Sequence, residues 1–142
     1  MYVVYPAYFM KDEDGYSVMF PDLPGALTCG ETLSEAMEMA VDCLAGFIHT
    51  NDEFGDETVA PSDIKNHTRA GAAKAWECSE NDVEIYPIGV DVYDYAKKHF
   101  RPLVHKNLTI ERWVNEEAKA LGINFSKTLQ DALIEKIRLT RG

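Results

Sequence analysis

The stretch VHKNLTI, Val104–Ile110, decides how the C-terminal part of the chain is interpreted. In an extended chain one side would carry Val104, Lys106, Leu108 and Ile110, and the other His105, Asn107 and Thr109. This period of two predicts a half-buried strand. Helical sequence follows at once, and no second strand lies near it in the sequence. Because an isolated strand is not stable in water, this one needs a partner.

Two helices are predicted after the strand, at Glu111–Leu121 and from Phe125 to Arg138. Gly122 suits the end of the first helix, and Asn124 can cap the start of the second. The inward positions would be Trp113, Val114, Ala118 and Leu121 in the first helix, and Leu129, Ala132, Leu133 and Ile137 in the second. About forty residues are too few to close a core alone.

The most economical partner is a second copy of the chain. Two such strands would pair antiparallel around a two-fold axis, and the resulting ribbon fits the major groove of DNA. The predicted dimerisation residues are Leu108, Ile110, Trp113, Leu129 and Leu133. The predicted DNA-binding residues are His105, Asn107 and Thr109 on the ribbon, and Asn124, Ser126 and Lys127 at a helix start that would meet a phosphate. The alternative is that the polar ribbon residues are the solvated face of an edge strand.

The first part of the chain predicts a small α+β domain with the order β-β-β-α-β. Its strands would be Tyr2–Met10 and Tyr16–Phe20 around the turn Lys11–Gly15, then Ala26–Gly30, and later Val83–Val90 with Pro87 at an edge or bulge. Thr32 and Glu35 have the spacing of a capping box. The helix that they open has an apolar stripe of Leu33, Met37, Ala40, Val41, Leu44 and Ile48, expected to pack on one sheet face.

Two connections complete the prediction. Residues 49–82 are polar and broken, which predicts a long surface loop with one helical turn near Pro61–Lys65. Asp91–Pro102 is expected to be a short helix or linker. The predicted domains are therefore residues 1–98, a linker at 99–103, and a β-α-α dimerisation and DNA-binding domain at 104–142.

The 142 residues carry a formal net charge of −10, and this charge is unevenly distributed. Residues 1–98 sum to −13 and residues 99–142 to +3. Such a split favours two units with different partners, although it can also arise by chance. No apolar run is long enough to span a bilayer, so no membrane partner is expected. The absence of a signal-like start and of CxxC spacing among Cys29, Cys43 and Cys78 favours a reducing cytoplasm.

Two motifs resemble a known family. The segment KNLTIERWVNEEAKALGINFSKTLQDALIEKI resembles a ribbon-helix-helix domain, in particular the one at the C-terminus of HicB antitoxins. The segment GYSVMFPDLPGALTCGETLSEAMEMAVDCL, Gly15–Leu44, resembles the N-terminal HicB domain, and PSDI, Pro61–Ile64, lies where such proteins carry a similar motif. The two motifs occur in the expected order and cover most of the chain.

The resemblance implies a function as well as a fold. HicB-like proteins neutralise a small basic ribonuclease toxin, HicA, which cleaves mRNA, and the complex represses its own operon through the antitoxin tail. It also implies a truncated ribonuclease-H-like fold for the N-terminal domain. The expected partners are thus a HicA-like toxin, operator DNA and a second copy of the chain, in an assembly that is either a dimer or a tetramer of two dimers. An acidic unit suits a basic RNA-binding partner, but the sequence does not identify the toxin-binding residues.

Enzymatic activity is not expected. Ribonuclease-H-like nucleases need carboxylates around metal ions, one of them in the first strand, and Tyr2–Met10 contains no Asp or Glu. Asp12, Glu13 and Asp14 cluster in a hairpin turn, where such residues are common. The four histidines, His49, His67, His99 and His105, lack ligand spacing, so neither a metal nor a cofactor is predicted. The competing hypothesis is a ligand- or partner-responsive ribbon-helix-helix regulator without a toxin; a weak nuclease is the third.

Overall fold

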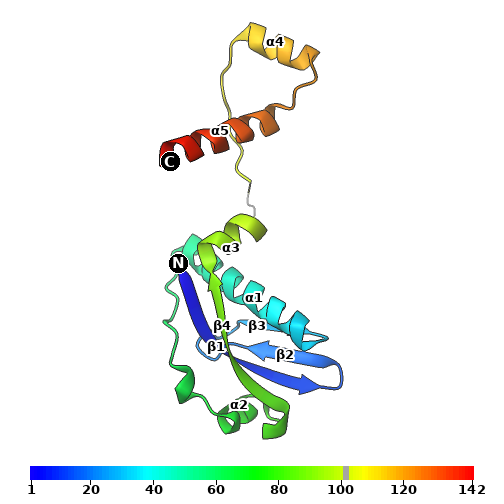
Figure 1. The fold of residues 1–142 in the computed structure, drawn as a ribbon, viewed down its shortest axis with the longest axis vertical. Helices are drawn as coiled ribbons and strands as arrows, with labels where there is room; N and C mark the ends of the chain where they lie inside the picture. The colour runs from blue at the N-terminus through cyan, green and yellow to red at the C-terminus, as the bar shows by residue number, and fades with distance from the viewer. Residues whose placement is uncertain (101–102) are drawn as a thin grey trace. The chain divides into compact units, whose positions relative to one another are not determined.

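The computed structural model describes residues 1–100 and 103–142 of the chain. The chain divides into two compact units, residues 1–102 and residues 103–142, and each is described by itself (Figure 1). The predicted domains were residues 1–98 and 104–142, with a linker at 99–103, and the observed boundary after residue 102 lies within that linker. Residues 101–102 of the predicted linker lie outside the described residues.

The first unit is built on a four-stranded antiparallel sheet. Its strands are β1 (Tyr2–Asp12), β2 (Gly15–Met19), β3 (Leu27–Gly30) and β4 (Val83–Asp91), in the order β3-β2-β1-β4. All four predicted strands are therefore confirmed, and β4 is an edge strand as Pro87 indicated. Pro87 lies opposite Pro6 of β1. Because proline has no N–H to donate, an edge position is where a strand tolerates it.

Helix α1 (Leu33–Phe54) covers one face of this sheet. It starts at a capping box, in which Thr32 Oγ1 accepts from the Glu35 N–H at 3.1 Å and Glu35 Oε2 accepts from the Glu31 N–H at 3.2 Å. The buried stripe consists of Ala36, Ala40, Leu44, Ala45 and Ile48. This agrees with the predicted stripe at its centre, but Leu33 is exposed.

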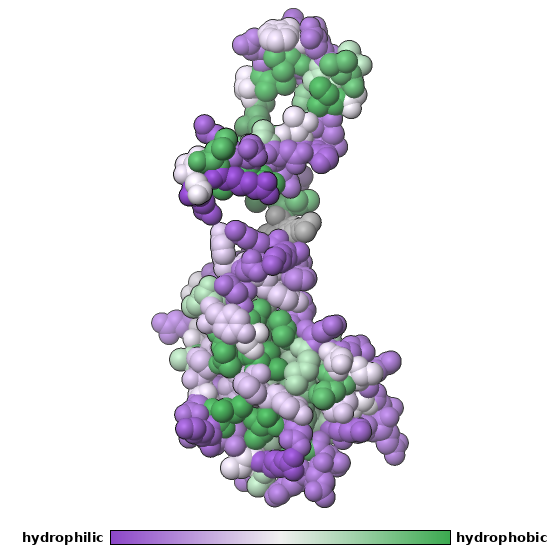
Figure 2. Space-filling model, in the orientation of Figure 1, coloured by the Kyte–Doolittle hydropathy of each residue, from purple (hydrophilic) through white to green (hydrophobic). Residues whose placement is uncertain are grey.

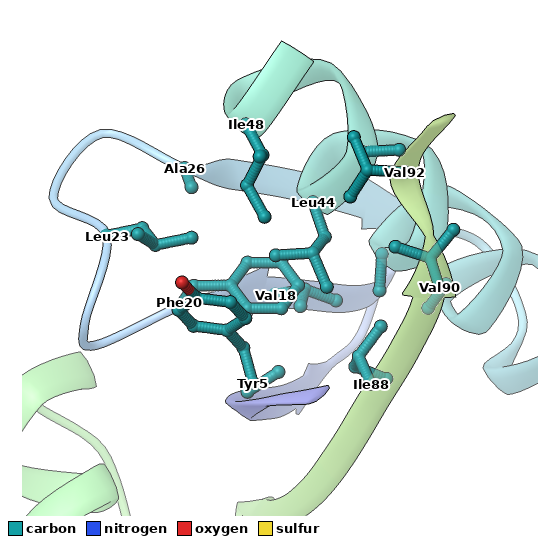
Figure 3. Close-up of a cluster of buried hydrophobic side chains, with 14 of the residues drawn as sticks. Tyr5, Val18, Phe20, Leu23, Ala26, Leu44, Ile48, Ile88, Val90 and Val92 are labelled. Atoms are coloured by element: carbon teal, nitrogen blue, oxygen red, sulfur yellow. The ribbon is translucent and has the colours of Figure 1, made fainter. Parts of the chain in front are cut away.

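The main core lies between α1 and the sheet (Figure 3). Figure 3 shows Leu44 and Ile48 of α1 pointing toward Tyr5, Val18 and Phe20, with Ile88 and Val90 of β4 beside them. Leu44 and Val18 have no exposed surface. Each fully buried side chain of this size stabilises the fold by about 1.5–3 kcal/mol.

Gly30, the first residue of the sequence GET ahead of α1, lies at a close contact between β3 and the helix. A Cβ at residue 30 would lie 2.5 Å from the backbone nitrogen of Ala36 and 2.8 Å from its Cα. The last residue of β3 therefore touches the first turn of the helix, and only glycine leaves room for this approach. This contact sets where α1 begins on the sheet.

The opposite face is covered in part by α2 (Arg69–Trp76), which packs against Tyr8 and Val83. This helix corrects the prediction of one long loop over residues 49–82. Helix α1 continues six residues past Ile48 to Phe54, and the 3-10 turns η1 (Ile64–Asn66) and η2 (Glu80–Asp82) flank α2. The predicted turn near Pro61–Lys65 corresponds to η1. Thr68 caps α2 by accepting from the Gly71 N–H at 3.0 Å.

Helix α3 (Val92–His99) closes the first unit by packing on α1. The Tyr95 hydroxyl donates to Asp42 Oδ1 at 2.9 Å. Burial, followed by this bond and the Asp42 charge, raises the pKa of Tyr95 to about 12. Because the pKa is raised, the contact stabilises the fold below pH 10 and is lost as the pH rises toward 12. The predicted short helix is therefore part of the first unit for as far as the chain is described.

The second unit contains α4 (Arg112–Ala120) and α5 (Phe125–Arg141), close to the predicted helices. Gly122 has φ +67°, its N–H donates to the Lys119 carbonyl, and the Ile123 N–H donates to the Ala118 carbonyl. This pair of bonds is a Schellman motif, which ends α4 at the predicted glycine. Residues 103–110 form no strand in the single chain. Among the described helices, none is long and apolar enough to cross a membrane.

Candidate nucleic-acid interface and toxin-binding unit

The predicted DNA-reading residues lie on an extended segment ahead of α4. His105, Asn107 and Thr109 are all exposed. No hydrogen bond from their side chains is formed within the part of the chain that the structure describes. Their donors and acceptors are therefore available to a partner outside the chain.

The start of α5 brings together the other three predicted DNA-binding residues. Asn124 Oδ1 accepts from the Lys127 N–H at 3.0 Å, so this side chain caps the helix as predicted. A capped helix still has N–H groups in its first turn without a partner in the helix, here those of Phe125 and Ser126. Lys127 Nζ lies 3.4 Å from Asp131 Oδ2, an exposed pair worth a few tenths of a kcal/mol. The positive end of the helix can thus meet an anion at little cost.

The predicted dimerisation residues share one property: each is exposed in the single chain. Leu108 is 62% exposed, Trp113 60% and Leu133 53%, and Ile110 and Leu129 are also exposed. Helices α4 and α5 contain no buried residue. Figure 2 shows apolar surface over both helices. Two ordered helices with uncovered apolar faces need another surface to pack against.

A chain of hydrogen bonds ties three distant segments of the first unit together. Tyr8 of β1 bonds His67 Nδ1 at 2.5 Å, and His67 Nε2 bonds Ser62 Oγ at 2.7 Å. Ser62 donates to Asp22 through its hydroxyl at 2.8 Å and through its backbone N–H at 2.8 Å. Asp22 belongs to PDLPG and Ser62 to PSDI, so this bond joins two of the short motifs that carry the resemblance described above.

The order of these groups differs from that of a catalytic triad. The Ser62 proton is directed to the Asp22 carboxylate, which can only accept. With this proton placement the serine oxygen is the acceptor for His67 Nε2, and the other ring nitrogen, Nδ1, is bonded to the Tyr8 hydroxyl. In a catalytic triad the histidine lies between the serine and the carboxylate and takes the serine proton. Here the serine lies between them, so the arrangement is a clamp. In the described part of the chain, no three His, Cys, Asp or Glu side chains come together as metal ligands.

The clamp holds the connecting segment, residues 55–68, against the sheet. Tyr5 adds a second tie, because its hydroxyl donates to the Val59 carbonyl at 2.6 Å. Sequence reasoning missed this arrangement. Asp22 and Ser62 are 40 residues apart, and the only signal in the sequence was the presence of the two short motifs PDLPG and PSDI.

We expect Ser62→Ala to lower the free energy of unfolding by about 1 kcal/mol, because it removes the hydroxyl that satisfies both Asp22 and His67. Urea unfolding followed by circular dichroism measures the change. Ser34→Ala, on the exposed side of α1, is the control and should stay within about 0.5 kcal/mol of the parent. Equal midpoints for the two variants would show that the clamp contributes nothing to stability.

Residues 5–132 match the family described as the HicB_like antitoxin of bacterial toxin-antitoxin systems. The chain belongs to this HicB-like antitoxin family. The match begins in β1 and ends in α5, so it spans both units.

Curated relatives of this HicB-like chain match it over shorter segments. Antitoxin HicB 2 of Photorhabdus laumondii is 58% identical over 40 residues, which is 28% of this chain and 29% of the relative. Antitoxin HicB of Escherichia coli K12 is 44% identical over 55 residues, 39% of this chain and 40% of the relative. The chain thus spans less than half the length of these two relatives.

Solved structures resemble the HicB-like chain over nearly its full length. A chain of the toxin–antitoxin complex from Streptococcus pneumoniae is 32% identical, with a TM-score of 0.61 and coverage of 96% of this chain and 99% of that one. The Burkholderia pseudomallei antitoxin HicB has a TM-score of 0.50 at 20% identity, over 96% of this chain and 97% of that one. This second likeness concerns the fold alone.

Proposed function

We propose that this chain is an antitoxin whose acidic first unit binds and inhibits a HicA-like, mRNA-cleaving toxin. Membership of the HicB-like family supports this function, as does the full-length likeness to a chain of a toxin–antitoxin complex. Charge supports it independently. The residues that form the first unit carry most of the acidic side chains, and an acidic surface offers an RNA-binding protein the charge sign of its substrate.

The second unit is proposed to dimerise and to bind the operator of its own operon. The observation that carries this part is that α4 and α5 fold without burying a residue. A second copy would cover these faces through Leu108, Ile110, Trp113, Leu129 and Leu133. Pairing of the two segments at residues 104–110 would then give a ribbon, a shape that enters the major groove.

In this arrangement the two kinds of DNA contact have different tasks. His105, Asn107 and Thr109 would face base edges from the ribbon. Asn124, Ser126 and Lys127 would place the start of α5 at a phosphate, where backbone N–H groups and the helix dipole favour an anion. The second unit is only weakly basic, so operator affinity would depend on specific contacts and on two dimers binding side by side.

Co-expression with the short basic reading frame expected beside this gene tests the proposal. We expect the two products to purify together and the toxin to lose its ribonuclease activity in the complex. Residues 1–100 alone should still bind the toxin, because their core includes α3 and Phe100, but they should not bind the operator. A regulator without a toxin would purify alone. Toxin binding by residues 103–142 instead of residues 1–100 would reverse the proposed division of tasks.

A further inference from the structure

A groove of about 520 Å³ lies between the start of β1, the end of α1 and the connecting segment. Its floor is apolar and includes Val3, Tyr5 and Ile48. Its rim carries three exposed carboxylates, those of Asp52, Asp56 and Glu57. We call this feature the acidic groove. An apolar floor below a charged rim suits a long side chain with an aliphatic stem and a charged end.

The rim carboxylates of the acidic groove have no cationic partner among the described residues. The N-terminal ammonium of Met1, which also borders the groove, is already paired with Asp91 Oδ1 at 3.3 Å. Asp52 lies in the last turn of α1, and this turn contains no basic residue. Because the C-terminal end of a helix is its negative end, acidic side chains there are unfavourable. A cation in the groove would offset both the unfavourable interaction of Asp52 with the negative end of α1 and the mutual repulsion of the carboxylates.

The first residues of β1, beside the acidic groove, are accessible to a partner, since Tyr2 and Val4 are exposed and Val3 is half-buried. Strand β4 pairs with β1 over Tyr2–Met10, but β2 pairs with it only from Tyr8 onward. Between Tyr2 and Ala7, β1 therefore has a strand on one side only. The connecting segment crosses near this edge, where Tyr5 bonds the Val59 carbonyl. Tyr5, Pro6 and Ala7 are buried, so a partner protein can approach the groove on this side only along Tyr2–Val4.

We infer that the acidic groove receives a lysine or arginine side chain of a basic protein partner. This inference rests on the proposed function and names the surface that the toxin would use. The stem of the side chain would lie on Val3, Tyr5 and Ile48, and its charged end would meet the rim. Arginine suits the site best, since its planar group can engage two carboxylates at once.

The first test compares two triple variants of the full chain with the same change in net charge. Asp52→Asn/Asp56→Asn/Glu57→Gln neutralises the groove, and Glu13→Gln/Asp14→Asn/Glu31→Gln neutralises exposed carboxylates at the β1–β2 turn and ahead of α1. Binding to the purified product of the neighbouring basic reading frame is measured by calorimetry. We expect the groove variant to bind at least about tenfold more weakly, and the control to change by less than about threefold.

Thermal unfolding shows whether weaker binding by the groove variant comes from lost contacts with the partner or from a destabilised fold. The groove variant should melt at a higher temperature than the parent, because neutral side chains remove the unfavourable charge at the end of α1. Weaker binding together with a higher Tm would support the inference. Equal weakening in both triple variants would assign the attraction to overall charge, and unchanged binding in the groove variant would overturn the inference.

A second experiment tests whether the groove binds a cationic side chain when no toxin is present. A capped Gly-Arg-Gly peptide is titrated into the chain while the methyl signals of Val3 and Ile48 are followed by NMR, with the citrulline peptide as a neutral isostere. Shifts with arginine only, which disappear in the groove variant, are the expected result. If the parent chain fails to bind the basic gene product, the proposed function fails, and this titration still decides whether the groove takes a cation. Equal shifts with both peptides, or no shift with either, would overturn the inference that the groove receives a cationic side chain.

Discussion

Leu108→Asp is expected to abolish dimerisation and operator binding together. Leu108 and Ile110 are the two ribbon residues proposed to face the shared core, and α4 and α5 have no buried residue to compensate for a loss there. In the dimer the substitution would bury two unpaired carboxylates around the two-fold axis, and burying an unpaired charge costs several kcal/mol. Sedimentation equilibrium and operator titration measure the two losses.

Thr109→Asp is the matched control for Leu108→Asp. It introduces the same charge one residue further along, on the face that points away from the helices in the proposed dimer. The dimer should persist while operator binding falls, because the carboxylates would then face the phosphates of DNA. Loss of the dimer in both variants, or in neither, would contradict the proposed orientation of the ribbon.

Asn107→Ala is expected to weaken operator binding by roughly 2 kcal/mol or more per dimer, because a base-reading contact contributes about 1–3 kcal/mol and each contact occurs twice. Preference at symmetric positions of the operator should relax as well. The measurement is titration against operator and scrambled duplexes at several salt concentrations. Toxin neutralisation should not change.

Lys127→Ala provides the contrast to Asn107→Ala. A phosphate contact releases counterions but reads no base, so this variant should lose affinity for all sequences alike and show a shallower salt dependence. Its ion pair with Asp131 is exposed, so the helix itself should lose little. If Asn107→Ala lowers operator and scrambled affinity equally, Asn107 reads no base. If it changes neither, the segment is a solvated edge.

Local signals in the sequence predicted much of the fold. The two strands on either side of the Lys11–Gly15 turn, the capping box at Thr32 and Glu35, and the glycine after α4 each depend on residues only a few positions apart. The structure contains these features where they were expected. The start of α5 was predicted for the same reason, since Asn124 and Lys127 are three residues apart.

Features that depend on distant residues or on weak periodicity were missed. Helix α2 has eight residues and is rich in alanine, so no apolar stripe distinguishes it from a loop. Its signals were the Thr68 cap and the alanines themselves. The bond between Asp22 and Ser62 joins segments whose proximity depends on the whole fold, and the acidic groove likewise requires α1 to continue to Phe54. The predicted DNA contacts involve a second chain, so the single chain does not test them.

The absence of buried residues in α4 and α5 has a consequence for the lifetime of the chain. Helices that bury no residue have little stability of their own, so dimerisation would stabilise the second unit more as the chain concentration rises. When the chain is scarce, single copies expose Leu108, Trp113 and their neighbours to proteases that cleave unfolded segments. When it is abundant, pairing protects them. The rate of degradation per molecule would then fall as the amount of antitoxin rises. Differences in antitoxin amount between cells would therefore become larger.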